Sequence, residues 1–298
     1  MIKDLWVEKY RPKTVDDMVL EESVKKYFSD HEKIQQNILL LGHCGIGKST
    51  LAKIIVNDIL DCQYIYINAS NENGIDTIRT KVHDFITTKS FDNKLKVVIL
   101  EEGDGLTAGS QQALRNSMEE VWERCIFILT ANFSHKIIEP IRSRCARFDL
   151  KYTQADYLKY IAGILKKEEI KIDKDLLGYI KGFYPDFRRC LNELQKNRVD
   201  DMIEIHRVGD SDFTAKLIGN IKDLSSFELR KFILEHTDDF GGDYDNLTQS
   251  LYIHILNDDE MEESIKMESL LVIGEINDNA MRVPDIEINF FTKILKIK

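Results

Sequence analysis

The sequence predicts an α/β fold, in which a doubly wound, parallel, five-stranded sheet is followed by two helical segments. Over residues 1–150, short apolar runs alternate with stretches of helical apolar spacing, a pattern typical of parallel sheets. A glycine-rich loop joins the first apolar run to a helix, as in many nucleotide-binding sheets. The remainder shows only helical spacing, so we predict three domains, spanning residues 1–150, 151–205 and 206–298.

Length and composition exclude several classes of protein. With 298 residues and 43% hydrophobic residues, the chain can bury the cores of two or three domains. No stretch approaches the roughly 20 apolar residues of a membrane span, so we expect no membrane partner. The N-terminus lacks the apolar core of a signal peptide. The five cysteines are scattered and form no C-x-x-C pair, which predicts a reducing cytoplasm and no zinc module.

The charge distribution permits nucleic-acid binding despite a net charge of −10. Residues 206–298 hold 10 Lys and Arg against 19 Asp and Glu, and this segment supplies almost all of the excess. The first two predicted domains are close to neutral, which leaves room for a local basic face.

The first predicted strand, Ile38–Leu41, leads into a phosphate-binding loop. Residues Gly42–Ser49 match G-x-x-x-x-G-K-[ST], and helical apolar spacing follows them. Glycines let backbone N–H groups turn toward phosphate oxygens, and the helix N-terminus adds a positive dipole end. Lys48 is expected on the β- and γ-phosphates, with the Ser49 hydroxyl on Mg²⁺. An ordinary βα turn is the alternative, but the flanks favour a nucleotide site, with contacts from Cys44, Gly45, Ile46, Gly47, Lys48, Ser49 and Thr50.

A second chemical element follows the predicted strand Lys96–Leu100. This apolar run ends in Glu101 and Glu102, about fifty residues after the phosphate-binding loop. In such sites the first acid holds Mg²⁺, usually through water, and the second deprotonates the attacking water. We therefore expect Glu101 on the metal side and Glu102 as the general base.

The other predicted strands are Tyr64–Ala69, Cys125–Leu129 and a short stretch around Phe148. Asn132 follows the fourth strand and could bind a water between Glu102 and the γ-phosphate; the alternative is that it caps the next turn.

Two further pairs of residues have two interpretations each. The aromatic Trp6 and Tyr10, near the N-terminus, either pack in the core or form an apolar slot for a purine. Arg79 and Lys81 lie on the polar faces of the helix after the second strand, as solvated charges or as phosphate contacts.

Helices are predicted elsewhere from apolar spacing and capping residues. Those before the third domain are Glu21–Asp30, a helix through Ile78 and Ile86, Thr107–Val121, Tyr157–Lys167, Lys174–Gly182 and Phe187–Asn197. In the last domain the apolar positions are Leu247, Leu251, Ile255, Leu270, Leu271, Ile273 and Ile276. Loops there are expected at 241–242 and 257–260.

Together these features resemble a sliding-clamp loader subunit, an AAA+ ATPase similar to replication factor C small subunits. The short length and diverged C-terminal part resemble the large clamp-loader subunit of T4-type phages. The resemblance covers about residues 5–198 and rests on Trp6–Pro12, Asn68–Arg79, Gln111–Arg115 with Met118 and Glu119, Ser143–Cys145, and Pro185–Arg189. It implies an AAA+ domain, a helical lid over 151–205 and a helical collar over 206–298, although the collar matches only by position and helicity.

The resemblance also implies roles that spacing alone does not. Arg144 would be an arginine finger for the nucleotide of the adjacent subunit. Asn132 would be sensor 1, and Arg188, in the lid, would be sensor 2 on the γ-phosphate. Gln111 would couple the nucleotide site to the DNA-facing helices.

Further implied contacts concern the base and the DNA. Arg79 and Lys81 would follow duplex phosphates. Residues near the adenine would be Val7, Tyr10, Arg11 and Val19.

The implied function is that of an ATPase motor. It would use ATP and Mg²⁺ to open a ring-shaped sliding clamp and place it on primer–template DNA. Its partners would be the clamp, the DNA and other loader subunits in a pentameric ring or spiral, with or without a distinct small subunit. It would work in the cytoplasm, or in the host cytoplasm if phage-encoded.

Two alternatives remain open at this point. The family usually has Asp where this chain has Glu101, so a nucleotide-gated scaffold that hydrolyses ATP weakly is one. An AAA+ helicase loader or branch-migration motor is the other, although no additional DNA-binding module is visible in the sequence.

Overall fold

The computed structural model describes residues 5–60, 62–88, 95–121, 123–204, 211–237, 244–256, 258 and 261–280. The chain divides into two compact units, Met1–Glu204 and Ile205–Lys298, which are treated separately below. The predicted division of the first unit near residue 150 stays a prediction.

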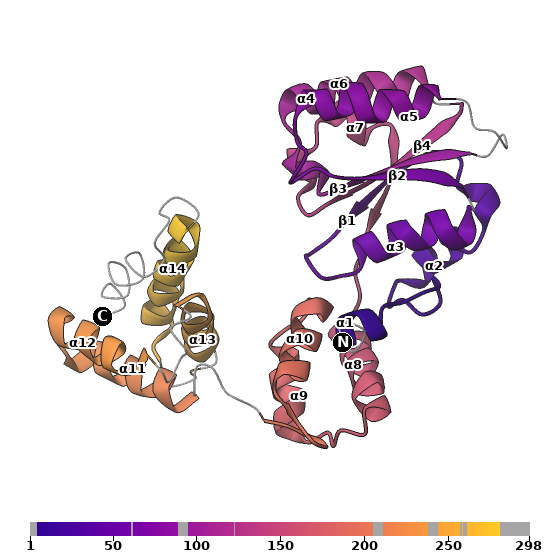
Figure 1. Ribbon diagram of the computed structural model, residues 1–298. Coiled ribbons are helices and arrows are strands. Elements are labelled where there is room, and N and C mark those ends of the chain that lie inside the picture. Colours follow the sequence, from indigo (N-terminus) through magenta and orange to yellow (C-terminus); the bar gives the residue numbers. More distant parts are fainter. Residues whose placement is uncertain are drawn as a thin grey trace. The chain divides into compact units, whose positions relative to one another are not determined.

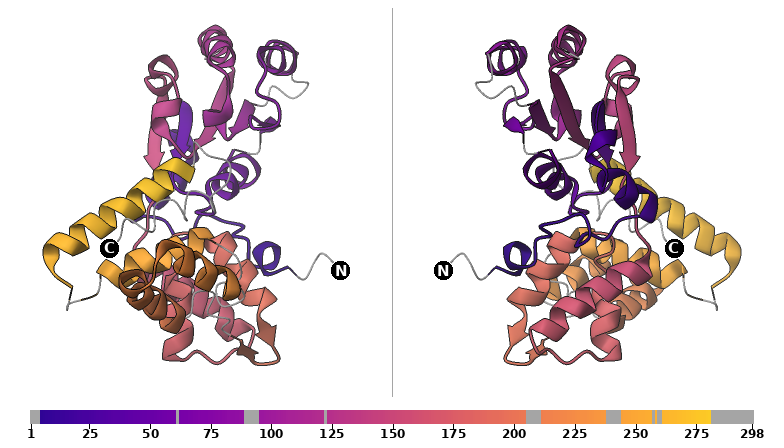
Figure 2. Two further views of the ribbon diagram at one scale, coloured as in Figure 1. Left: turned by 90° about the vertical axis from the view of Figure 1, so that its left-hand side faces the viewer. Right: turned by 90° about the vertical axis from the view of Figure 1, so that its right-hand side faces the viewer.

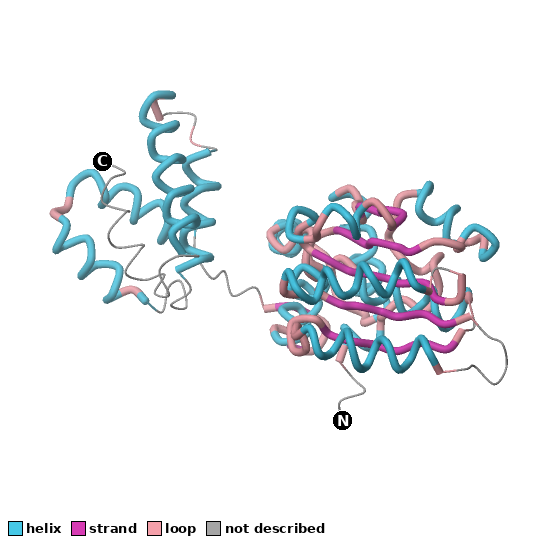
Figure 3. The backbone as a smooth tube through the Cα atoms, turned by 90° about the horizontal axis from the view of Figure 1, so that it is seen from above, coloured by secondary structure: helices cyan, strands magenta, loops and turns pink. Residues whose placement is uncertain are grey.

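The first unit contains a five-stranded parallel sheet with the strand order β2-β3-β4-β1-β5 (Figures 1 and 3). This arrangement confirms the predicted fold class. The strands are β1 Asn37–Leu41, β2 Gln63–Asn68, β3 Lys96–Glu101, β4 Cys125–Ala131 and β5 Cys145–Asp149. The predicted ends of the first four strands lie within two residues of these, and those at Leu41, Lys96 and Cys125 coincide.

Burial explains why the central strands appear in the sequence as apolar runs. Every residue of β3 and β4 is buried, because helices cover both faces of the sheet. β2 lies at the edge of the sheet, and there Tyr64 and Tyr66 remain 40% and 41% exposed.

Helices cover the sheet on both faces (Figures 1 and 2). On one face lie α2 Glu22–Phe28 and α3 Lys48–Ile54, which continues into a π-helical turn, Ile55–Ile59. On the other face, a core cluster joins Leu39, Leu100 and Leu129 of the sheet to Leu114 and Met118 of α6. The helices of this second face are α4 Ile75–Thr77, a π-helical turn Ile78–Val82, α5 His83–Thr87, α6 Ala108–Glu120 and α7 Glu139–Arg142.

The segment after the sheet consists of α8 Gln154–Lys167, α9 Lys174–Lys181 and α10 Phe187–Lys196. The prediction of helices alone was incomplete here, because β6 Arg198–Val199 and β7 Met202–Ile203 form a small antiparallel hairpin. Strands of two residues are too short to show an alternating pattern in the sequence. A further short helix that the sequence analysis missed, α1 Trp6–Lys9, packs against α10.

The second unit consists of helices among its described residues: α11 Ser211–Asp223, α12 Ser226–Glu235, α13 Tyr244–Leu256 and α14 Glu263–Ala280. Of the apolar positions named from the sequence, Leu247, Leu251, Ile255 and Ile273 are buried in its core and Leu270 packs against it, whereas Leu271 is 64% exposed. The predicted loop at 241–242 and most of that at 257–260 lie outside the described residues, as does the side chain of Ile276.

No helix in the described ranges is long and apolar enough to cross a membrane.

Candidate nucleotide site

The phosphate-binding loop follows β1 at the carboxyl edge of the sheet and ends where α3 begins at Lys48. Gly45 and Gly47 adopt φ values of +70° and +105°, which residues with side chains rarely do. At Gly45 the space is also closed, since an added Cβ would lie 1.8 Å from Oδ1 of Asp186. The loop therefore touches the residue that caps α10, which brings this helix to the nucleotide site.

Lys48 points back toward the loop and toward the tip of β4. Its Nζ donates to the carbonyl oxygens of Gly42 and His43, at 2.9 and 2.8 Å, and to Oδ1 of Asn132 at 2.7 Å. Burial lowers the pKa of Lys48 from its usual 10.5, and nearby Arg188 adds to this, whereas Asp104 and Glu102 oppose it. A bound polyphosphate would favour the charged form, because it would add negative charge beside the ammonium group.

Asn132 is itself held by a carboxylate that the sequence analysis left without a role. Oδ2 of Asp104 accepts hydrogen bonds from the backbone N–H groups of Asn132 and Phe133, each at 3.2 Å. This Asp104 contact fixes the tip of β4, so the amide of Asn132 faces Lys48. Asn132 is therefore oriented by a partner, and not only by the strand that precedes it.

Glu101 ends β3 and is only 8% exposed. One carboxylate oxygen accepts a hydrogen bond from the hydroxyl of Tyr66 on β2, while Oε1 is buried without a partner. Glu101 and Ser49 line the same pocket, together with Tyr66 and Arg188. A buried carboxylate and a serine hydroxyl that line one pocket fit a Mg²⁺ site that is completed by water and phosphate oxygens. Within the described residues no cluster of three or more His, Cys, Asp or Glu forms a site made by protein ligands alone.

Glu102 adopts a left-handed backbone conformation, with φ of +53°. Its N–H donates to Oγ1 of Thr130 at 3.2 Å, which ties it to β4. Its carboxylate accepts a hydrogen bond from the hydroxyl of Ser70, which follows β2. A non-glycine residue in this conformation is strained, and such strain is found at functional sites where neighbours hold it in place. Ser70 was not identified from the sequence.

A pocket next to the loop has the lining expected of a site for a nucleoside, with apolar walls and a few polar side chains. It contains nine of the twelve residues predicted to bind nucleotide, and its apolar walls come from the N-terminal segment, the loop and α10. Its lining residues include Val7, Tyr10, Arg11, Val19, Gly45, Ile46, Gly47, Thr50, Arg188 and Phe187.

Of the predicted nucleotide residues outside this pocket, Ser49 lines the neighbouring pocket and Lys48 lies beside the loop. Cys44 is exposed and lines neither pocket.

Trp6 has the packing role rather than the purine-binding role. It is 2% exposed, and its backbone N–H donates to Oε1 of Gln195 on α10 at 2.7 Å. Arg198 lies over its ring, with the guanidinium carbon 5.6 Å from the ring centroid.

Gln111 lies behind the strand ends and not in the pocket. It is buried in α6, and both ends of its side-chain amide form hydrogen bonds. Nε2 donates to the carbonyl oxygens of Leu106 and Lys136, and Oε1 accepts a hydrogen bond from the backbone N–H of Ile138 at 2.8 Å. These bonds link the segment after Glu102 to the segment that follows the β4 tip.

The remaining candidate residues are separate from both pockets. Arg144 is 37% exposed and pairs with Glu119, and its Nη1 donates to the carbonyl oxygen of Pro140 at 2.7 Å. Arg79 is exposed on the π-helical turn, and Lys81 on the same turn pairs with Glu72 at 2.5 Å.

Comparison with known proteins gives three findings. The AAA family, described as "ATPase family associated with various cellular activities", matches residues 38–154. A replication factor C small subunit of Staphylothermus marinus is 40% identical over 200 residues, which cover 64% of this chain and 61% of that protein. The corresponding subunit of Archaeoglobus fulgidus is 31% identical over 292 residues, which cover 92% of this chain and 91% of that protein.

The alignments with the first relatives therefore span a little over three fifths of their length. These relatives are archaeal, and they give no support to the expected phage origin. Among solved structures, the RuvB Holliday junction branch migration motor of Thermotoga maritima superposes with a TM-score of 0.54 at 16% identity, over 96% of this chain and 90% of that one. At this identity the likeness concerns the fold alone.

Proposed function

Because this chain belongs to the family of replication factor C small subunits, we propose that it is an ATPase subunit of a sliding-clamp loader. The observation that carries the proposal is the meeting of Lys48, Asn132 and Glu101 at one sheet edge, with Arg188 of the following helical segment beside them. This is the set that phosphoryl transfer from a nucleoside triphosphate needs.

ATP is the proposed substrate, with its base in the apolar pocket and its phosphates on the loop. Lys48 and Arg188 supply positive charge to the phosphates, and Asn132 orients the attacking water. Ser49 and Glu101 would hold Mg²⁺, which supplies charge neutralisation on the phosphate oxygens when bound. The unpartnered buried oxygen of Glu101 supports this assignment, since a bound cation would remove the cost of burying it.

Glu102 is the proposed general base. The hydroxyl of Ser70 donates to one oxygen of this carboxylate and holds it in place, and a carboxylate has further acceptor positions from which it can take a proton from water.

Arg144 is the proposed arginine finger for a neighbouring copy or subunit. Its exposure and its separation from the chain's own pockets support a role in trans. An arginine supplied to a transferring phosphoryl group can be worth about 10³–10⁵ in rate. Glu119 would have to release Arg144 when the neighbour's phosphates arrive.

The proposed partners are other loader subunits, a ring-shaped clamp and primer–template DNA. Arg79 and Lys81 would contact duplex phosphates, with Lys81 exchanging Glu72 for phosphate. Such contacts read shape and charge rather than base sequence, so binding should weaken steeply with added salt.

The test is complementation between two defective variants in the reconstituted loader. Lys48→Ala removes the chain's own phosphate contact, and Arg144→Ala removes the group lent to its neighbour. Loaders that carry both variants should recover ATP turnover at seams where an intact Lys48 meets an intact Arg144, whereas loaders of either variant alone should not. Absence of recovery, with full turnover by isolated wild-type chains, would refute a shared site.

The same preparations separate the alternatives. Turnover that neither clamp nor primed DNA stimulates would favour the nucleotide-gated scaffold. Co-purification with a hexameric helicase, rather than with a ring clamp, would favour the helicase loader.

A further inference from the structure

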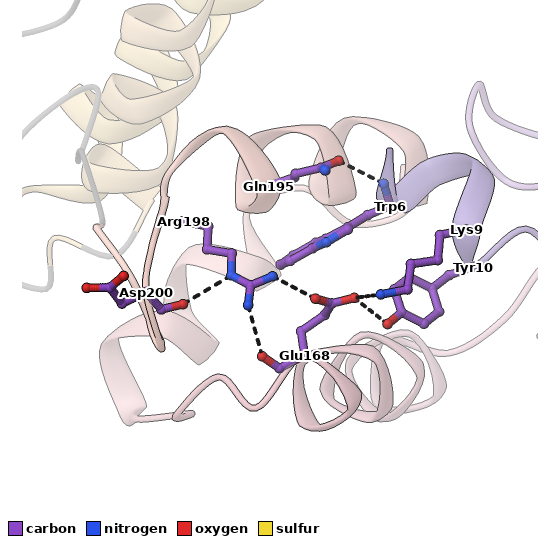
Figure 4. A network of polar contacts seen from close by, with 7 residues as sticks. All are labelled: Trp6, Lys9, Tyr10, Glu168, Gln195, Arg198 and Asp200. Atoms are coloured by element: carbon purple, nitrogen blue, oxygen red, sulfur yellow. Dashed lines mark hydrogen bonds and ion pairs between the residues drawn. The ribbon is translucent and has the colours of Figure 1, made fainter. Parts of the chain in front are cut away.

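The N-terminal segment that forms one wall of the base pocket is fastened to the helical segment by one buried carboxylate, Glu168. This residue follows α8 and is 8% exposed. Its Oε1 accepts hydrogen bonds from Lys9 Nζ and the Tyr10 hydroxyl, each at 2.5 Å, and its Oε2 accepts one from Arg198 Nη1 at 2.6 Å (Figure 4). One side chain thus joins two residues of the N-terminal segment to β6.

Further contacts join the same two parts of the chain. The guanidinium of Arg198 lies over the ring of Trp6, and the backbone N–H of Trp6 donates to Oε1 of Gln195 on α10 (Figure 4). The hydroxyl of Tyr160 on α8 donates to the carbonyl oxygen of Tyr10 at 3.0 Å. The N-terminal segment is therefore attached to α8, α10 and β6, far from it in sequence.

The charge on Glu168 is stable near neutral pH. Burial raises its pKa, but hydrogen bonds from Lys9, Tyr10 and Arg198 outweigh this and bring the pKa below the usual 4.5. The pKa of Lys9 is raised in turn by its hydrogen bond to Glu168. Removal of the carboxylate would leave the half-buried hydroxyl of Tyr10 without its acceptor, whereas the exposed cations of Lys9 and Arg198 would keep their contact with water.

We propose that Glu168 is a positioning residue for recognition of the base, because it holds Tyr10 and the N-terminal segment against the lid that carries Arg188. Tyr10 and Val7 of this segment and Arg188 of α10 line one pocket. Binding of the base and ribose of a purine nucleoside triphosphate then depends on this attachment. Binding of its phosphates depends on the loop and on Arg188, which stays on α10 when Glu168 is replaced. The inference rests on the proposed ATP binding.

This division of labour gives a test that a general loss of stability would not reproduce. Binding of ATP and of inorganic tripolyphosphate, each with Mg²⁺, is measured by calorimetry on the full chain. Glu168→Gln should raise the Kd of ATP about 10-fold and leave that of tripolyphosphate within about twofold. Glu169→Gln, an equal charge change at the adjacent exposed residue, should alter neither.

Tyr10→Phe is the second variant, for the case that Glu168→Gln does not fold. It keeps the ring in the pocket and removes only the hydroxyl that donates a hydrogen bond to Glu168. The Kd of ATP should therefore rise about threefold, and the Kd of tripolyphosphate should not change. Wild-type ATP affinity in the variants, or equal losses for both ligands, would overturn the inference. Failure of the wild-type chain to bind ATP would instead overturn the proposed function.

Discussion

Gly45→Ala tests the contact between the phosphate-binding loop and the helical segment. Gly45 has φ of +70°, and a Cβ there would lie 1.8 Å from Oδ1 and 2.4 Å from Cγ of Asp186. The side chain of Asp186 cannot rotate away without loss of a contact, because the same Oδ1 accepts a hydrogen bond from the backbone N–H of Arg189 at 2.9 Å and so caps α10. The substitution must strain the loop or displace the cap.

The expected cost follows from these two terms. A left-handed conformation costs a residue with a side chain about 1–2 kcal/mol. Loss of an aspartate cap costs about 1 kcal/mol. The two terms sum to about 2–3 kcal/mol. If this sum destabilises the conformation that binds nucleotide, the Kd of ATP rises about 30- to 150-fold.

The assay is an ATP titration of the purified chain, accompanied by thermal unfolding. Gly74→Ala is the matched control, because a Cβ at Gly74 meets nothing within 4 Å, and it should bind ATP like the wild type. Adding Asp186→Ala to Gly45→Ala should cost less than the sum of the single variants, since both single variants lose the Asp186 cap and the double variant loses it only once. Additive losses, or wild-type affinity in Gly45→Ala, would refute this reasoning.

Three other predictions concern single side chains. Glu102→Gln should lower single-turnover hydrolysis about 10²- to 10⁴-fold while the Kd of ATP stays within about twofold, and a variant with full turnover would exclude Glu102 as the base. Cys44 is an exposed residue of the phosphate-binding loop, whereas burial raises the pKa of the Cys125 thiol to about 12. A maleimide at neutral pH should therefore label Cys44 first. Saturating ATP should slow this labelling, as measured by mass analysis of the peptides. Labelling of Cys44 at the same rate with and without ATP would contradict the proposed position of the phosphates. Folding lowers the pKa of Glu168, so the stability that this carboxylate contributes is full above the unfolded value near 4.5 and is lost as the pH falls through the folded value. In denaturant unfolding, Glu168→Gln should therefore lose less stability than the wild type as the pH falls through this range. Parallel pH dependences of the two proteins would argue against the network.

The sequence alone determined the sheet, the loop and the acids that follow β3. These features are written in short stretches: a buried parallel strand is a continuous apolar run, and a phosphate-binding loop needs glycines and a lysine at fixed spacing. The carboxyl ends of parallel strands also share one edge, so the nearness of Glu101 to Ser49 could be expected before the fold was seen. The hairpin at 198–203 and the exposure of Leu271 could not, because two-residue strands and helix rotation leave little trace in apolar spacing.

Only the tertiary structure decided how the site is held together. Glu168 meets Lys9 across 159 positions, and Asp104 meets the N–H of Asn132 across 28. Trp6 could equally have faced a purine or the core until Gln195 and its helix were in place. Side chains that are far apart in the chain leave no periodic signal in it, because their pairing depends on how complete elements pack rather than on any local preference.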